Sequence, residues 1–533
     1  MLAIHHLQCK NHNPVYQARQ TKRMMNKTRI KTIAALTIFL FACTNTNVDS
    51  HSVTKKAEKY EANWESLSKH KAAPEWFVDA KLGIYFHWGV YTVPGRNTEW
   101  YPRNMYLKDN VVYKHHLKTY GDPADFGYHD FVPMFKAEHF DPEDWATLFQ
   151  QAGARFAGPV AQHHDGFAMW ASEVNPWNVM DKGPERDILG ELFSSLKKRE
   201  MKTIATFHHA RNGQRNADKP ENWYNAYDSH YPYVPDWPTS TTDPELRKLY
   251  GNFPTIDEFN QYWLDQVNEV VDKYSPDIIW YDSWLNLIPE SYRQEMAAHF
   301  FNHGSKNNQE VVTCHKQTDM PMSCSVLDFE QGGRREIYPM PWMTDITISN
   351  RSWSYIEGQT YKDAALVLRN MIDVWSKNGI VLLNISPRAD GVIPDEQRKV
   401  LLEIGAWLEK YGEAVYETRP FDLFGYGTAN DIAGAHGGQS AKMEYTAEDV
   451  RFTVSKDDKT MYVFFLGKPE AGKRIQMRSL GKHRYPTRSP IKRVTLLGTN
   501  TEVEWELTTN HFYLTIPEVE MNELATVFKF ELE

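Results

Sequence analysis

The feature that most constrains the fold of this chain is an alternation of amphipathic and short apolar segments between Trp76 and Tyr416. Residues 141–153 begin with an Asp suited to cap a helix and carry apolar side chains at helical spacing, and an apolar run follows at 154–167. A first strand is expected at 81–91. Further pairs of the same kind are 187–200 with 201–209, 259–274 with 275–284, and 293–304 with 309–316. This rhythm predicts an α/β fold, namely a (β/α) barrel similar to a TIM barrel.

The character of the sequence changes after Pro420. A glycine-rich stretch at 424–438 precedes segments in which apolar and polar residues alternate, at 451–456, 460–468, 491–498, 502–509 and 525–533. Such period-two patterns, separated by turn residues, are typical of antiparallel strands. We therefore expect a catalytic barrel at 51–418 that is followed by a C-terminal antiparallel β-sandwich at 419–533.

The first 50 residues are expected to be an export segment and tether. Basic residues precede the apolar stretch 33–42, which is too short to span a bilayer permanently and ends at Cys43. The residues LFAC resemble a bacterial lipobox, which implies lipidation of Cys43 and export to the periplasm, outer membrane or cell surface. The residues before Met24 or Met25 look like an over-extended start. The alternative for the apolar stretch is a short buried helix.

The charge balance and the cysteines exclude several classes of function. The 69 acidic and 60 basic residues give a net charge of −9 and are scattered, without the Lys/Arg stripe that nucleic acid requires. Cys314 and Cys324, which could pair or stay free, are not spaced like a metal or redox centre. The 17 Trp and 28 Tyr supply flat faces on which sugars stack, although core packing accounts for most of them.

Polar side chains stand where several of the predicted strands end. Barrel active sites lie at the C-terminal ends of the strands, so these residues should converge on one pocket. They are His87, His163, His164, His208, His209, Asp282 and Lys316.

Six separated motifs occur in an order that resembles glycoside hydrolase family twenty-nine, the α-L-fucosidases. The motifs are GIYFHWG, NTEWYPRNMY, QHHDGFAMW, PDIIWYD, SWSY and KNGIVLLNISPRADG, and the resemblance covers about Trp76 to Pro420. It implies a retaining, exo-acting enzyme that hydrolyses terminal α-L-fucosyl linkages of oligosaccharides, polysaccharides or glycoconjugates without a cofactor. The alternatives are a barrel glycosidase for a related sugar, such as an α-galactoside-like substrate, and a non-catalytic fucose-binding barrel.

Retaining glycosidases need an ionised carboxylate as nucleophile and a second carboxyl group as acid and base. Asp282 follows an apolar strand and occupies the family's nucleophile position, although an Asp at such a place can also cap the next helix. For the acid/base we expect Glu330 in SVLDFEQGG, with Glu336 as the main competitor and Asp328 as a weaker one.

The resemblance also implies a sugar pocket. It assigns the binding of fucose hydroxyls to His87, Glu99, Trp100, His163 and His164, and Trp353 with Trp284 could form the wall that receives the C6 methyl group. Core packing is an equal alternative for Trp284.

The chain departs from the family pattern at three positions. His208 stands in FHH, where relatives often carry a pair of tyrosines, and is expected to replace one Tyr near the nucleophile. Lys316 stands where many relatives have Arg, and Met343 where the residue is commonly polar. These differences concern substrate preference.

A metal-dependent barrel hydrolase is the remaining class to weigh. The HHD sequence at 163–165 and the pair His208 and His209 could ligate a divalent ion. Adjacent residues of a strand point to opposite faces, however, and the chain has no HExxH sequence. We therefore expect no metal. The predicted partner is a fucosylated glycan, with membrane contact only through the lipid anchor.

Overall fold

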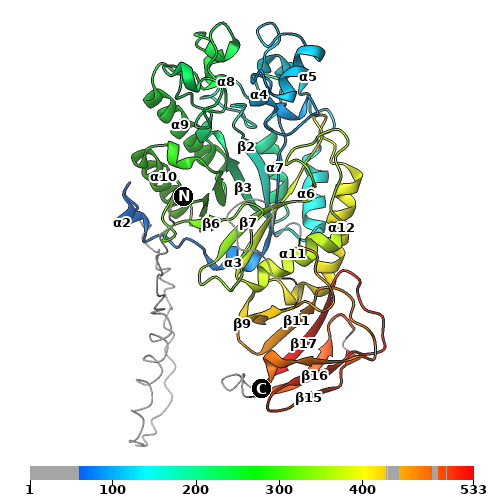
Figure 1. Cartoon of the computed structure of the whole chain (residues 1–533). Helices are drawn as coiled ribbons and strands as arrows, with labels where there is room; N and C mark the ends of the chain where they lie inside the picture. The colour runs from blue at the N-terminus through cyan, green and yellow to red at the C-terminus, as the bar shows by residue number, and fades with distance from the viewer. Residues whose placement is uncertain (1–58, 428, 430–442, 483–489, 500) are drawn as a thin grey trace, which may run out of the picture. The chain divides into compact units, whose positions relative to one another are not determined.

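The structure is a computed structural model that describes residues 59–427, 429, 443–482, 490–499 and 501–533 (Figure 1). Cys43 and the rest of the predicted export segment lie outside these residues. Residues Ala57–Glu533 form one compact unit. No helix in the described part of the chain has the length and apolar character needed to cross a membrane.

Eight parallel strands close into a barrel in which each strand pairs with the next along the chain and β8 pairs with β1. The strands are β1 (Leu82–Phe86), β2 (Phe156–Gln162), β3 (Lys202–Phe207), β4 (Ile278–Tyr281), β5 (Val312–Lys316), β6 (Val326–Asp328), β7 (Trp342–Thr347) and β8 (Gly379–Ile385). Nearly all their residues are buried, because the interior side chains fill the barrel and helices cover the outside. The predicted TIM-like barrel is confirmed.

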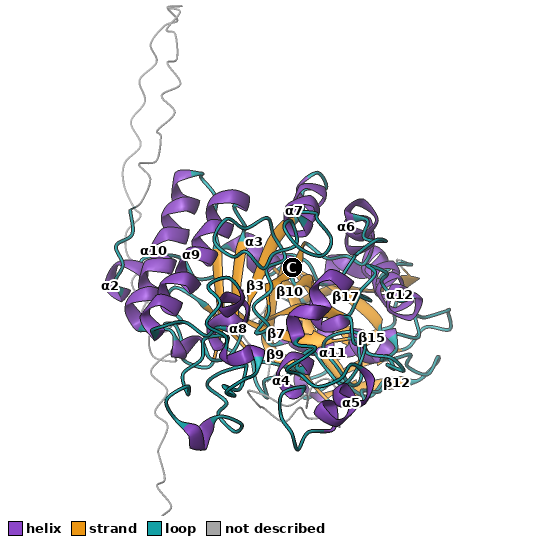
Figure 2. Ribbon diagram, turned by 90° about the horizontal axis from the view of Figure 1, so that it is seen from above, coloured by secondary structure: helices purple, strands orange, loops and turns teal. Residues whose placement is uncertain are grey.

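Helices surround these strands, as the view from above shows (Figure 2). They are α2 (Trp64–Leu67), α3 (Glu75–Ala80), α4 (Tyr101–Asn104), α5 (Val111–Thr119), α6 (Pro142–Gln151), α7 (Ile188–Lys197), α8 (Leu246–Tyr250), α9 (Ile256–Tyr274), α10 (Glu290–Lys306), α11 (Ala364–Ser376) and α12 (Asp395–Tyr411). The carboxylate of Asp141 accepts hydrogen bonds from the backbone N–H groups of Glu143 and Asp144 at 2.9 and 3.2 Å. Asp141 thus caps α6 where the sequence predicts the helix to begin.

Two antiparallel sheets follow the barrel. Their strands are β9 (Thr418–Tyr426), β10 (Val450–Ser455), β11 (Thr460–Phe465), β12 (Arg474–Met477), β13 (Ile491–Leu496), β14 (Thr501–Glu502), β15 (Trp505–Leu507), β16 (Phe512–Thr515) and β17 (Thr526–Leu532). The larger sheet has the order β14-β13-β17-β11-β10-β9 and the smaller one β12-β16-β15. Phe452 and Phe528 of the first sheet and Phe512 of the second share one apolar core, which confirms the predicted sandwich.

The division between the two predicted domains is less sharp than the change in sequence pattern. Strand β9 begins at Thr418, beside the expected boundary, yet the barrel and the sheets belong to the same compact unit. The boundaries at 51–418 and 419–533 therefore stay a prediction. Cys314 and Cys324 are buried and free.

Candidate active site

A cavity of about 300 Å³ opens at the C-terminal ends of the barrel strands. Its lining consists of His87, Glu99, Trp100, His163, His164, His208, Arg211, Tyr227, Asp282, Ser283, Trp284, Lys316, Gln317, Glu330, Asp345 and Trp353. The structure thus brings together Asp282, Glu330 and all the residues that the sequence analysis expected to bind the sugar. They converge because parallel strands end at the same mouth of a barrel.

Asp282 directly follows β4, and its side chain is 15 % exposed. Its Oδ1 accepts a hydrogen bond of 2.9 Å from Lys316 Nζ, and its Oδ2 lies 3.3 Å from His164 Nε2. Burial alone would raise the pKa of this carboxyl group, but Lys316, His208 and His164 hold it well below its ordinary value. Asp282 is therefore ionised, as a nucleophile has to be.

Lys316 ends β5 and connects three carboxylates from the buried floor of the pocket, where its side chain is only 3 % exposed. Besides Asp282, its Nζ contacts Glu330 Oε2 at 3.0 Å and Asp345 Oδ2 at 3.3 Å. Burial opposes the charge, yet these carboxylates raise the pKa of Lys316 well above its ordinary value. Because one Nζ contacts both, the bound oxygens of Asp282 and Glu330 are at most about 6 Å apart.

The three candidates for the acid/base, Glu330, Glu336 and Asp328, occupy different places. Glu330 lies two residues beyond β6, lines the cavity, and is 28 % exposed. Glu336 is exposed and does not belong to the cavity lining. Asp328 is buried, and burial together with its neighbour Asp345 raises its pKa well above the ordinary value. Of these acids, Glu330 shares the cavity with Asp282.

The pocket histidines lie at the ends of the first three barrel strands. His87 follows β1, His163 and His164 follow β2, and His208 follows β3. Burial lowers the pKa of all four rings, for His87 to about 4. Neutral imidazoles provide one donor and one acceptor each, which suits the hydroxyl groups of a sugar.

His164 has a second function in this arrangement. Its Nδ1 donates a hydrogen bond to the carbonyl oxygen of His208, so Nδ1 carries a proton in either charge state. Nε2 lies 3.3 Å from Asp282 Oδ2, and this contact offsets part of the effect of burial, which still leaves the pKa of His164 below its ordinary value. His164 therefore links the nucleophile candidate to the strand that carries His208.

His209 is a correction to the sequence analysis, which expected it in the pocket. The structure places its ring against Trp263, with the ring centroids 6.0 Å apart, and outside the cavity lining. His208 and His209 both follow β3, but His209 already belongs to the short turn His209–Arg211, in which its ring packs against Trp263.

Glu99 and Trp100 stand in the loop between β1 and α4. Glu99 Oε2 accepts a hydrogen bond of 3.3 Å from Ser352 Oγ, and burial raises the pKa of Glu99 to about 7. Trp353 follows Ser352 in the chain, and its ring centroid lies 5.4 Å from that of His87. The loop after β7 thus holds both a partner of Glu99 and one apolar wall of the pocket.

Arg211 lines the pocket and was not anticipated from the sequence. It ends the short turn His209–Arg211 after β3, and its guanidinium lies 4.4 Å from the Trp100 ring centroid and 4.8 Å from that of Trp284. Trp284 is half-buried and lines the cavity, in a left-handed backbone conformation with φ of 80°. No local pattern could have revealed Arg211, because both tryptophans are far from it in sequence.

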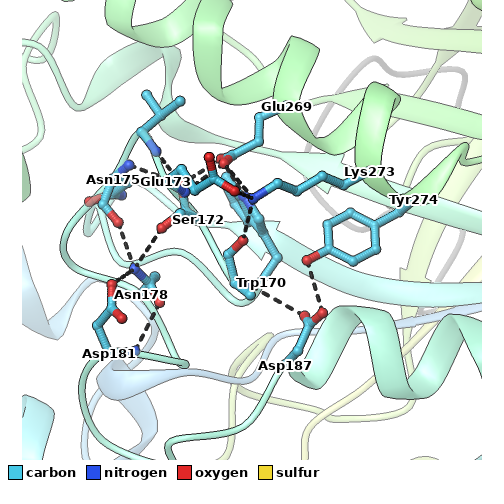
Figure 3. A network of polar contacts seen from close by, with 12 residues as sticks. Trp170, Ser172, Glu173, Asn175, Asn178, Asp181, Asp187, Glu269, Lys273 and Tyr274 are labelled. Atoms are coloured by element: carbon cyan, nitrogen blue, oxygen red, sulfur yellow. Dashed lines mark hydrogen bonds and ion pairs between the residues drawn. The ribbon is translucent and has the colours of Figure 1, made fainter.

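The long loop after His163 and His164 is tied to α9 (Figure 3). Glu269 accepts hydrogen bonds from Trp170 Nε1 at 2.9 Å, from Ser172 Oγ at 2.5 Å and from the backbone N–H of Glu173 at 2.6 Å. Lys273 pairs with the same carboxylate at 3.0 Å. These contacts fix the loop that leaves the pocket histidines.

The fold and the site together define the class of protein. At the mouth of an eight-stranded (β/α) barrel, Asp282 and Glu330 both contact the ammonium group of Lys316, and histidines and tryptophans surround them. This arrangement is the architecture of a glycoside hydrolase.

Comparison with known proteins narrows this class. Residues 48–413 match the α-L-fucosidase family, and residues 443–533 match the α-L-fucosidase C-terminal domain. The chain belongs to the α-L-fucosidase family. It is 29 % identical to the tissue α-L-fucosidase of Rattus norvegicus over 84 % of this chain and 86 % of that protein, and 25 % identical to that of Homo sapiens over 89 % and 91 %. The crystal structure of Thermotoga maritima α-fucosidase in complex with fucose is similar, with a TM-score of 0.69, 26 % identity, and coverage of 89 % of this chain and 100 % of that one.

Proposed function

We propose that this protein is a retaining, exo-acting α-L-fucosidase that removes terminal α-L-fucosyl groups by double displacement. The observation that carries the mechanism is the shared contact of Asp282 and Glu330 with Lys316, which keeps their oxygens within about 6 Å of each other. Retaining glycosidases separate their carboxyl groups by ~5–5.5 Å and inverting ones by ~6.5–9.5 Å. The similarity to the Thermotoga maritima enzyme solved with fucose supports fucose as the sugar.

In the first step Asp282 attacks the anomeric carbon and forms a glycosyl–enzyme ester. Lys316 and His164 keep the carboxylate ionised before the attack. Glu330 protonates the leaving oxygen while the glycosidic bond breaks.

In the second step water replaces Asp282 at the anomeric carbon. Glu330 takes a proton from this water, as microscopic reversibility requires. Once Asp282 is an ester, the positive charge of Lys316 faces fewer carboxylates, which favours the ionised form of Glu330 that a base needs. Two displacements at the same carbon retain the configuration.

The sugar is held by the neutral histidines, Glu99 and Trp100, and Trp353 packs against its apolar face. Neither the α-galactoside-like substrate nor the non-catalytic barrel has a specific observation in its favour. An ionised carboxylate beside a second carboxyl group favours catalysis over mere binding.

The test of the nucleophile is Asp282→Ala. This change should abolish turnover of an aryl α-L-fucoside, because no group remains to form the ester. Azide should partly restore the reaction by occupying the vacated space, and the product should be a fucosyl azide of inverted configuration, identified by nuclear magnetic resonance. Normal turnover by the variant would exclude Asp282 as the nucleophile.

The test of the acid/base is a comparison of Glu330→Ala with Glu336→Ala. The first variant should still release a good leaving group in the first step but hydrolyse the ester slowly, and it should lose most activity on oligosaccharides, because poor leaving groups need protonation and the second step needs a base. Glu336→Ala is the matched control and should behave as the wild type, since its side chain lies outside the pocket. The reverse pattern would assign the role to Glu336.

We also infer that the chain is exported and anchored by lipid on Cys43, on the basis of the basic flank, the apolar stretch and the LFAC sequence. Membranes of a bacterium that expresses the full chain should contain the protein with a diacylglyceryl group on Cys43, detectable by mass spectrometry. Cys43→Ser should release the chain from the membrane fraction. An unmodified Cys43 in membrane-bound wild-type protein would contradict the anchor.

A further inference from the structure

Three histidine rings meet in the pocket from three neighbouring strands. Among the described residues, His87, His163 and His208 each offer one ring nitrogen, and these three nitrogens all lie within 4.8 Å of one another. The sequence analysis judged metal binding from histidines that are adjacent in the chain. The structure instead groups one histidine from the end of each of β1, β2 and β3. These three histidines are far apart in the sequence, so the sequence does not reveal the group.

The protonation state of the three rings suits a metal ion. Metals bind neutral imidazole, and burial lowers the pKa of each of these histidines, so all three are neutral near pH 7. In addition, Nδ1 of His163 and Nδ1 of His208 are buried and have no hydrogen-bond partner in the described part of the chain. These two nitrogen atoms therefore make no hydrogen bond that a metal ion would have to replace.

One of the rings is held as metal-binding histidines usually are. His87 Nδ1 lies 2.8 Å from Asn384 Oδ1, and since an amide oxygen only accepts, Nδ1 carries the proton. The lone pair of His87 is therefore on Nε2. A metal-ligating histidine almost always donates its other N–H to such an oxygen, which fixes the tautomer and the ring orientation.

The electrostatics of the site also favour a cation. The negative charge of Asp282 acts on both His87 and His208, where it opposes the effect of burial on their pKa values. His164 is engaged elsewhere, between the His208 carbonyl and Asp282, and does not belong to the cluster. The positive charge of Lys316 lies nearby and would repel a metal ion, but its contacts with three carboxylates offset this charge.

We propose that His87, His163 and His208 form a binding site for a divalent transition-metal ion of the Zn²⁺ or Cu²⁺ type, and that the bound ion excludes the sugar from the pocket. Zinc binds imidazole nitrogens at ~2.0–2.1 Å, which corresponds to ~3.4 Å between ligands in a tetrahedron, so the three nitrogens, which lie within 4.8 Å of one another, have to move closer together when the ion binds. All three histidines line the cavity that the sugar would occupy. The ion is an inhibitor, and the second half of the proposal rests on the proposed function.

The test measures binding directly, so it does not depend on activity. Chelator-treated full-length protein is titrated with Zn²⁺ by calorimetry, and Co²⁺ is added separately to record the visible absorption of a four-coordinate site. We expect one ion per chain. His208→Phe and His87→Gln should each weaken the affinity at least tenfold, with folding verified by circular dichroism. His139→Ala, which removes an exposed histidine outside the cavity lining, is the matched control and should bind as the wild type does.

A second measurement tests the competition. Zn²⁺ should raise the apparent KM for an aryl α-L-fucoside without changing kcat, and saturating L-fucose should weaken the calorimetric affinity for Zn²⁺. Absence of one-to-one binding, or equal binding by the wild type and both folded variants, would overturn the site. Inhibition that lowers kcat alone would overturn the exclusion of the sugar. If the protein binds Zn²⁺ through these histidines but cleaves no fucoside, the proposed function fails and the metal site stands.

Discussion

Lys316 is the residue on which the charges of the site depend. A buried ammonium that contacts Asp282, Glu330 and Asp345 makes it possible for three carboxylates to share one small volume. Without it, their mutual repulsion and their burial would raise the pKa of Asp282. The role resembles that of a metal ion, which also concentrates negative charge at one point, but here a side chain of β5 supplies it.

We predict that Lys316→Met moves the acid limb of kcat/KM to higher pH. Asp282 has a pKa held well below its ordinary value, with Lys316 the largest lowering influence, so loss of the ammonium raises this pKa and protonates Asp282, the proposed nucleophile, at a pH where the wild type is active. At pH 5 we expect a loss in kcat/KM of about tenfold or more, equivalent to about 1.4 kcal/mol. The measurement is the pH profile on an aryl α-L-fucoside.

Lys316→Arg is the control, since it keeps the positive charge at the end of β5. Its acid limb should stay near that of the wild type even if its rate falls. A Lys316→Met profile that coincides with the wild-type profile would show that Lys316 does not control the ionisation of Asp282.

At the scale of elements, the close approach of α12 to α6 depends on one glycine. A Cβ on Gly405 would lie 1.9 Å from the carbonyl oxygen of Gln151 and 2.9 Å from the Cα of Ala152. Both atoms belong to backbone and cannot move aside without shifting α6. The barrel thus fixes the spacing of its outer helices by backbone contact as well as by side-chain packing.

We predict that Gly405→Ala lowers the free energy of unfolding. Overpacking costs about 1–3 kcal/mol, whereas the gain in helix propensity is about 1 kcal/mol, so the net effect should be destabilising. Chemical denaturation followed by circular dichroism measures it. Glu409→Ala, an exposed change on the same helix, should stay within about 0.5 kcal/mol of the wild type. A Gly405→Ala protein as stable as the wild type would mean that α12 moves freely on α6.

At the scale of the whole molecule, a buried ion pair joins the barrel to the C-terminal sheets. Arg451 Nε of β10 donates to Asp373 Oδ1 of α11 at 2.5 Å, and Lys377 Nζ contacts the other oxygen at 2.7 Å. Both Arg451 and Asp373 are almost completely buried. The pair explains in part why barrel and sheets form one compact unit.

We predict that Arg451→Met destabilises the protein by about 3–5 kcal/mol, because it leaves a buried carboxylate with only one cation. The double variant with Asp373→Leu should be less destabilised than the sum of the two single changes, which a double-mutant cycle by chemical denaturation measures. The exposed pair Arg474 and Glu506 is the matched control, and removing it should cost less than about 1 kcal/mol. Equal effects at both pairs would contradict a structural role for Arg451.

The sequence by itself determined the features that depend on local patterns. Helical spacing and the cap at Asp141 predicted α6, apolar runs that end in polar residues predicted most barrel strands, and alternation predicted the sandwich. Asp282 could be singled out because it follows such a run within a motif. Strands β6, β7 and β8 were not among the predicted strands: β6 has three residues, too few for a periodic pattern, β7 contains polar Thr344 and Asp345, and β8 was used only as part of a family motif.

Only the tertiary structure decided which of the candidate residues meet. It brings Glu330, and not Glu336, to Lys316, turns His209 away from the pocket that receives His208, and encloses Arg211 between Trp100 and Trp284. The grouping of His87, His163 and His208 likewise appears only when three strands lie side by side. The physical reason is that periodicity and capping act between residues a few positions apart, whereas these contacts join residues from 14 to 121 positions apart, and only the folded barrel brings them together.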